Sequence, residues 1–171
     1  LYALAEQRQL LPWRDAMFNG EQVNATEQRQ VMHWLLRCPS ADTVPAHLQD
    51  EWREMAAVRS AFLDFAETVR ANPQITDVVN IGIGGSDLGP RMAVQALGGH
   101  VDPNKRFHFV SNIDGHEIQD VLAQLQPQHT LFIVASKTFT TLETMTNART
   151  ALAWFKAANN GQYAHQVAEH F

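Results

Sequence analysis

The sequence has 171 residues, of which 45% are hydrophobic, 18% charged and 9% aromatic. This composition excludes collagen-like, low-complexity and disordered chains, and at roughly 150 residues per domain the length predicts one domain, or one with a fragment of another. A formal net charge of −5 argues against a protein that binds nucleic acid or an anionic membrane through a basic surface.

Three further features of the chain bear on its location and extent. The single cysteine, Cys38, forbids an internal disulfide and a cysteine metal cage, so a reducing cytoplasm is the expected location. No apolar run approaches the ~18 residues of a membrane span. The chain begins at Leu1 without Met and stops at Phe171 within a predicted helix, so we expect it to be a piece of a longer protein.

Helical patterns dominate the first 72 residues. Asn24 with Glu27 predicts a capping box that opens a helix. A clearer helix follows and ends at Asn72-Pro73. Its apolar residues recur every three or four positions, which predicts one core-facing stripe. The stripe consists of Leu48, Trp52, Met55, Val58, Phe62, Phe65 and Val69.

The pattern changes near residues 73–76, where short apolar runs begin to alternate with helical stretches. The runs 77–83, 106–110 and 130–135 are typical of buried parallel strands. Helices are predicted at about 86–97, 114–124 and 140–158. The alternation predicts an α/β fold, a three-layer α/β/α sandwich with a parallel sheet. We expect a helical segment over residues 1–75 and the first part of an α/β domain over residues 76–171.

Ligands bind at the carboxyl ends of parallel strands, and the first unusual loop lies at such a point. It is the run Gly82-Ile83-Gly84-Gly85-Ser86-Asp87-Leu88-Gly89-Pro90. Its glycines let the backbone approach a ligand, and its amides and the helix dipole favour an anion or sugar hydroxyls. A dinucleotide fingerprint would need glycine at Asp87 and an acid near Ser111-Asn112, so NAD is disfavoured. A purely structural tight turn remains the alternative.

The second loop follows the third predicted strand and starts a helix. It offers Lys137 beside a set of hydroxyls, which suits a phosphate dianion at a helix N-terminus. The hydroxyls belong to Ser136, Thr138, Thr140, Thr141 and Thr144. The alternative is that one threonine caps the helix and Lys137 is merely solvated. Glu143 either orients a catalytic group or simply favours the first helical turn as a carboxylate.

Other candidate chemistry is weak. The eight histidines show no metal-ligand spacing, so we expect no metal site and assign them surface or hydrogen-bonded core roles. Cys38 has no recognisable base near it in sequence and is interpreted as an inert thiol.

The two loops give the sequence a resemblance to the glucose-6-phosphate isomerase (phosphoglucose isomerase) family, in order along essentially the whole chain. The stretches that carry it are 81–90, Phe109-Val110-Ser111-Asn112-Ile113-Asp114-Gly115, 135–144 with Thr146-Asn147-Ala148, and Phe18-Asn19-Gly20-Glu21 with Asn24 and Thr26-Glu27. One departure is Leu142, where many relatives carry Gln; only the polar contact of that side chain is affected.

The resemblance implies a sugar-isomerase-type domain and an aldose–ketose isomerase of glycolysis and gluconeogenesis. The enzyme interconverts glucose 6-phosphate and fructose 6-phosphate through a cis-enediol by general acid–base catalysis, without metal or organic cofactor. The members are cytoplasmic homodimers. Carried onto matching positions, the phosphate contacts are Ser136, Lys137, Thr138 and Thr141, the sugar contacts Gly85 and Ser86, and the supporting residue Glu143.

The family's catalytic base, ring-opening groups and enediolate-facing arginine match no residue of this chain. We therefore expect residues 1–171 alone to be inactive. Two alternatives from other classes stay open at this point. One is a non-catalytic domain that senses sugar phosphates, and the other is a nicotinamide-dependent dehydrogenase, which the glycine loop disfavours.

Overall fold

A computed structural model describes all 171 residues, which form two compact units, Leu1–Glu67 and Thr68–Phe171. Each unit is described by itself. The domain division at residues 1–75 and 76–171 stays a prediction. None of the helices combines the length and the apolar composition that a membrane span needs.

The first unit is helical and has a small core. Its helices are α1 (Tyr2–Gln7), α2 (Leu10–Phe18) and the long α3 (Gln49–Ala71), which continues past the end of the unit. Short 3₁₀ turns between α2 and α3 span His33–Arg37, Ala41–Thr43 and Ala46–Leu48. Leu35, Val44 and Leu48 form the core, and the ring of Trp34 packs edge-on against Phe18 at 5.1 Å.

The predicted capping box at Asn24 is wrong. The Asn24 side-chain oxygen accepts the Glu27 N–H at 3.2 Å and the Thr26 hydroxyl at 2.8 Å, but no helix follows. Asn24 instead pairs with Arg29 in an isolated antiparallel bridge, so the segment turns back on itself. The same short polar side chain that caps helices also closes turns, and here the turn wins.

The predicted core-facing stripe is confirmed at its two ends but not in its middle, since Val69 near the end of α3 is partly buried against Ile75, Val78 and Leu131. Leu48 is buried, whereas Val58, Phe62 and Phe65 are 68%, 60% and 57% exposed. The core of the first unit touches only the first turns of α3 through Trp52 and Met55. Periodicity reports one apolar face of a helix, but it does not say how far a partner extends along that face.

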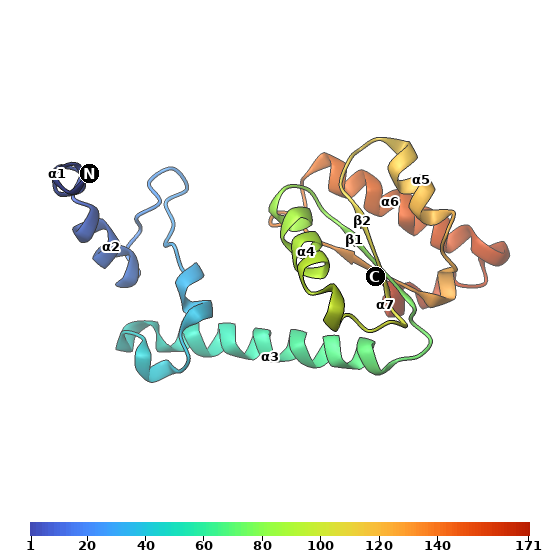
Figure 1. Cartoon of the computed structure of the whole chain (residues 1–171), viewed down its shortest axis with the longest axis horizontal. Helices are drawn as coiled ribbons and strands as arrows, with labels where there is room; N and C mark the ends of the chain where they lie inside the picture. The colour runs from blue at the N-terminus through green and yellow to red at the C-terminus, as the bar shows by residue number, and fades with distance from the viewer. The chain divides into compact units, whose positions relative to one another are not determined.

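The second unit is a parallel three-stranded sheet in the order β2-β1-β3 (Figure 1). Its strands are β1 (Asp77–Ile81), β2 (Arg106–Val110) and β3 (Thr130–Val134). The first residues of the three strands align, because Asp77 lies opposite both Arg106 and Thr130. The carboxyl ends therefore align as well, and the loops that follow the strands leave from one edge of the sheet.

Helices cover both faces of this sheet. They are α4 (Gly85–Ala96), α5 (Gly115–Leu122), α6 (Leu142–Ala157) and the short α7 (Val167–His170). Figure 1 shows α4 on one side and α5 with α6 on the other. Short 3₁₀ turns connect these elements at Gly98–His100, Pro127–His129, Ala158–Gly161 and Ala164–Gln166. The predicted α/β fold with a parallel sheet is confirmed.

Alternation along β1 divides the apolar core between the two faces of the sheet. Val79 and Ile81 pack with the α5 and α6 residues Ile118 and Phe155. Val78, which points the opposite way, packs with Ile75 and Leu131.

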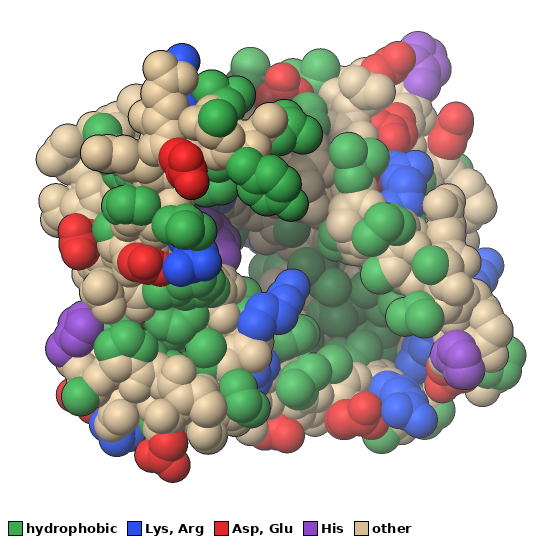
Figure 2. Space-filling view, turned by 60° about the vertical axis from the view of Figure 1, so that its left-hand side comes forward, with side chains coloured by type: hydrophobic (Ala, Val, Ile, Leu, Met, Phe, Trp, Pro, Cys, Tyr) green, Lys and Arg blue, Asp and Glu red, His purple; other side chains and the backbone are tan.

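On the surface, acidic and basic side chains are interspersed over the face drawn in Figure 2.

Candidate functional site

The candidate site lies at the carboxyl edge of the sheet, where the loops after β1 and β3 meet. The point of closest approach is Gly82, which is buried. A Cβ placed on Gly82 would lie 2.9 Å from the Ser86 Cβ and 3.0 Å from the Ala135 carbonyl oxygen. The glycine is therefore required by packing, because any side chain would push the two loops apart.

The glycine loop leads directly into α4 and leaves open space at its tip. Gly84 has φ 60° and ψ −128°, a conformation that L-residues rarely adopt. Gly85 is exposed, and a Cβ there would meet nothing within 4 Å. Ser86 is half-buried, and its carbonyl accepts a hydrogen bond from the Asn80 side chain at 2.9 Å. The loop is thus held from below by β1 and is open above Gly85.

The sequence pattern did not indicate the structural role of Asp87. It is buried in the first turn of α4 and forms an ion pair with Arg91 at 3.0 Å. The Arg91 guanidinium in turn lies over the Phe109 ring, 5.2 Å from its centroid. The spacing of four residues on one helix was the available signal.

The second loop runs from Ala135 to the start of α6. The Ser136 hydroxyl accepts the Phe139 N–H at 3.0 Å, and the hydroxyls of Thr138 and Thr140 lie 2.7 Å apart. Phe139 itself has a positive φ of 52°. Local hydrogen bonds therefore shape this loop into a tight turn, with the Lys137 and Thr138 side chains exposed.

The position of Thr141 tests the alternative interpretation, in which one threonine of this loop only caps the helix. Thr141 occupies the N-cap position of α6, but its side chain makes no capping hydrogen bond. The hydroxyl is therefore not committed to the helix amides. Since the first N–H groups of a helix lack partners within the helix, an anion can bind there. Glu143 is half-buried in the first turn, and the structure gives it no distinct role.

The structure thus brings the predicted residues to one edge from two elements. Gly85 and Ser86 open α4, while Ser136, Lys137, Thr138 and Thr141 precede α6. We call these two segments the glycine loop (82–86) and the hydroxyl loop (135–141). Which of these residues contact a ligand stays a prediction.

A third loop at the same edge, residues 111–114 after β2, carries contacts that the sequence did not single out. Glu117 on α5 accepts the N–H groups of Ser111 at 3.3 Å and Asn112 at 2.6 Å. The buried Asn147 side chain on α6 donates to the Asn112 carbonyl at 2.6 Å. The only signal for Asn147 was the run Thr146-Asn147-Ala148 in the family resemblance.

The opposite, amino edge of the sheet holds the strongest charge cluster. The buried Asp77 carboxylate accepts hydrogen bonds from Arg106 at 2.8 Å, His108 at 2.8 Å and Thr76 at 2.9 Å. Burial works to raise the pKa of Asp77, but these hydrogen bonds outweigh it and the net pKa is lowered. The same contact raises the pKa of Arg106 above its usual value.

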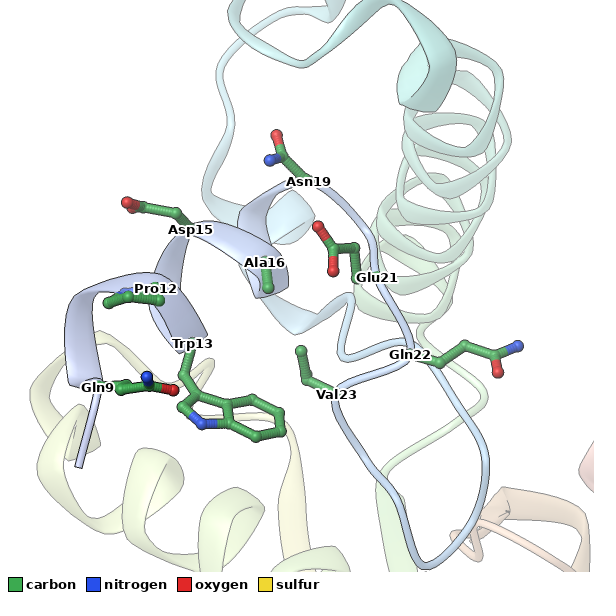
Figure 3. Close-up of a pocket in the computed structure, with 9 residues that line it drawn as sticks. All are labelled: Gln9, Pro12, Trp13, Asp15, Ala16, Asn19, Glu21, Gln22 and Val23. Atoms are coloured by element: carbon green, nitrogen blue, oxygen red, sulfur yellow. The ribbon is translucent and has the colours of Figure 1, made fainter.

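Two other features of the chain do not coincide with the candidate site. A pocket of about 530 Å³ lies in the first unit, lined by α2 and the segment after it (Figure 3). Trp13 and Val23 form part of its apolar wall. It contains none of the predicted site residues. No group of three or more histidine, cysteine or acidic side chains is arranged to hold a metal ion.

Comparison with known proteins decides the family. The family model for phosphoglucose isomerase matches residues 1–171, the whole chain. The chain belongs to the phosphoglucose isomerase family.

Individual members of the family agree with this assignment. The glucose-6-phosphate isomerases of Albidiferax ferrireducens and Polaromonas naphthalenivorans are 58% and 56% identical over 177 residues, covering 100% of this chain and 33% of theirs. A crystal structure of a glucose-6-phosphate isomerase from Chlamydia trachomatis matches with a TM-score of 0.68 and 30% identity, over 99% of this chain and 32% of that one. The chain therefore spans about a third of the length of the relatives it matches.

Proposed function

We propose that this chain supplies the substrate-holding part of a glucose-6-phosphate isomerase. The reaction interconverts glucose 6-phosphate and fructose 6-phosphate by moving a proton between C2 and C1 through a cis-enediol. The meeting of the glycine loop and the hydroxyl loop at Gly82 carries the proposal, because it places helix amides, hydroxyls and Lys137 around one edge of the sheet. The family match supports it.

In this proposal the hydroxyl loop binds the phosphate. The uncapped start of α6, the uncommitted Thr141 hydroxyl and the exposed Lys137 supply the hydrogen bonds and positive charge that a dianion needs. Ser136 and Thr138 bind alongside them. Gly85 and Ser86 face the sugar, where the absence of a side chain at Gly85 leaves room for the hydroxyls of the substrate.

Binding of the phosphate contributes to catalysis because it positions the reacting part of the substrate. Binding energy from a part of the substrate that does not react fixes the reacting carbons against the acid–base groups. Those groups, a carboxylate base among them, match no residue of this chain, and Glu143 supports one of them. We further propose a sugar-isomerase-type domain, a cytoplasmic location, a homodimer, and a place in glycolysis and gluconeogenesis. The sensor alternative is not favoured, since the similar proteins are named as isomerases.

The test uses a chimera in which residues 1–171 replace the matching segment of the Albidiferax ferrireducens relative. We expect this chimera to convert fructose 6-phosphate to glucose 6-phosphate in an assay coupled to glucose-6-phosphate oxidation. Residues 1–171 alone are expected to show no turnover. Because the proposed site binds the substrate through its phosphate, fructose without phosphate should be a far poorer substrate. A well-folded chimera with no isomerase activity would contradict the proposed function.

A further inference from the structure

The backbone of Asn112 is held from both sides at the carboxyl edge of the sheet. Its N–H donates to Glu117 on α5, and its carbonyl accepts from Asn147 on α6, each at 2.6 Å. The contact with Glu117 is local, five residues along the chain, whereas Asn147 lies 35 residues further along and reaches Asn112 only through the fold. This pair of contacts, the Asn112 clamp, ties two helices to one loop.

Asn147 is an unusual residue at its place in α6. It is 2% exposed and shares its face of the helix with the apolar residues Ala148, Ala151 and Phe155. Burying an amide among apolar groups is unfavourable unless the amide is hydrogen-bonded. A leucine or alanine would pack there without that requirement, so the contact with Asn112 is the role that the structure gives to this side chain.

The direction of the contact matters for α6. Apolar packing through Ala148 and Ala151 is non-directional and holds the helix against α5 and β1 without fixing its position along its own axis. A hydrogen bond of 2.6 Å to the backbone of a loop does fix that position. The start of α6, with Thr141 and the hydroxyl loop, moves with the helix. The clamp therefore ties the start of α6 to the loop after β2, in addition to the packing at Gly82 that joins the glycine loop and the hydroxyl loop.

We propose that Asn147 is a positioning residue, which with Glu117 holds the start of α6 where the substrate phosphate binds. The inference rests on the proposed function, and it adds a residue that touches no substrate. Loss of the clamp lets α6 shift and weakens phosphate binding. The acid–base groups match no residue of this chain, so their chemistry is unaffected. The signature is a raised KM for fructose 6-phosphate with an almost unchanged kcat.

The experiment measures KM and kcat of the chimera with Asn147→Asp and Asn147→Ala. The aspartate keeps the volume of asparagine, but an ionised carboxylate cannot donate to the Asn112 carbonyl. We expect KM to rise about tenfold in both variants, the size of one lost hydrogen bond, with kcat within about twofold. Glu117→Ala should act in the same direction, and the double variant should show less than the sum of the two effects.

Two controls separate positioning from general loss of stability. Leu122→Val thins the core at the far end of α5, so it should lower the melting temperature without changing KM. Thr150→Ala removes an exposed hydroxyl that bonds only within α6, and it should change neither. If Asn147→Ala keeps the KM of the active parent chimera, or if its kcat falls by as large a factor as its KM rises, the positioning role is wrong and the proposed function stands. An inactive parent chimera overturns both.

Discussion

The two edges of one small sheet use their polar side chains in opposite ways. At the amino edge, Arg106 and His108 both donate to Asp77, and the buried Lys105 ammonium donates to the Asn72 and Ile75 carbonyls. At the carboxyl edge, Glu117 and Asn147 hold the loop after β2, but the Thr141 side chain leaves α6 uncapped and Gly85 faces open space.

The difference separates stability from binding along three short strands. Polar groups that satisfy one another are fixed and leave little for a ligand, whereas a helix start without a cap keeps its donors for one. The same strands supply both edges. The comparison predicts that substitutions at the amino edge act on folding, and that most substitutions at the carboxyl edge act on ligand binding.

The largest effect is expected from Asp77→Ala. Removing the carboxylate takes the acceptor from Thr76 and from His108, which is 14% exposed, and also from Arg106, which is 60% exposed. We expect the free energy of unfolding to fall by about 3 kcal/mol, the upper end of the cost of leaving a buried donor unpaired, because the exposed Arg106 stays hydrated. Urea unfolding measures it, with Asp120→Ala on the exposed face of α5 as the matched control. A loss no larger than that of the control would contradict the role of this cluster.

The same carboxylate should make the fold sensitive to acid. Its pKa is lowered in the folded state, so its contribution to stability is complete above the ordinary aspartate pKa, about 4, and is lost as the pH falls through the lower folded value. Unfolding midpoints measured across acidic pH should therefore fall less steeply in Asp77→Asn than in the parent. Equal slopes would show that other carboxylates cause the acid dependence.

Next in size is the effect of Lys137→Ala on binding. A charge-assisted contact to phosphate contributes ~1.5–3 kcal/mol, so KM of the chimera for fructose 6-phosphate should rise by about 10- to 150-fold. The melting temperature should not change, because the side chain is exposed. Lys156→Ala, in the last turn of α6, the helix that follows this loop, is the matched control. An unchanged KM would remove Lys137 from the site.

Alanine substitutions at two glycines test whether the stability of the carboxyl edge depends on close packing. Gly82→Ala places a Cβ against Ser86 and the Ala135 carbonyl and should reduce the free energy of unfolding by about 1–3 kcal/mol. Gly85→Ala enters open space at the start of α4 and should change it by less than about 0.5 kcal/mol. Equal losses in urea unfolding would mean that the two loops do not meet at Gly82.

The smallest effect is expected from Thr144→Val. The Thr144 hydroxyl is buried without a hydrogen-bond partner among protein atoms, so replacing it with a methyl group of similar shape should be neutral or slightly stabilising. At the amino edge, Thr130→Val removes a hydroxyl that donates to the Gln126 carbonyl at 2.8 Å, and it should cost about 1 kcal/mol. A larger loss of unfolding free energy in Thr144→Val than in Thr130→Val would contradict the difference between the two edges.

Prediction from the sequence succeeded where a pattern is long and local. The three strands and the helices between them appear within a few residues of the expected ranges, since β-branched runs and helical periods each repeat over several positions. Gly82 and Ile83 fall outside β1 because the chain turns there toward α4. The two candidate loops were found because glycines and hydroxyls are unusual in composition.

Other contacts join residues that are far apart in the sequence. Asp77 meets Arg106 because the two strands start in register, and that register is set by packing of the whole sheet. Asn147 reaches Asn112 only because α6 crosses back over α5 and β1. In the first unit, the stripe of α3 was read correctly as one face, but the residues that would cover Val58 and Phe62 are not given by periodicity.

The outer side of β3 has a consequence for handling the chain. His129 turns its carbonyl toward β1, so the Thr130 carbonyl points outward, where the buried His170 bonds to it at 2.6 Å. Further along, Ile133 is exposed, and the strand Thr-Leu-Phe-Ile-Val has neither charge nor proline. Such an edge is a template for strand addition. Purified residues 1–171 should therefore aggregate through β3 as the protein concentration rises. The substitution Ile133→Lys should delay this aggregation.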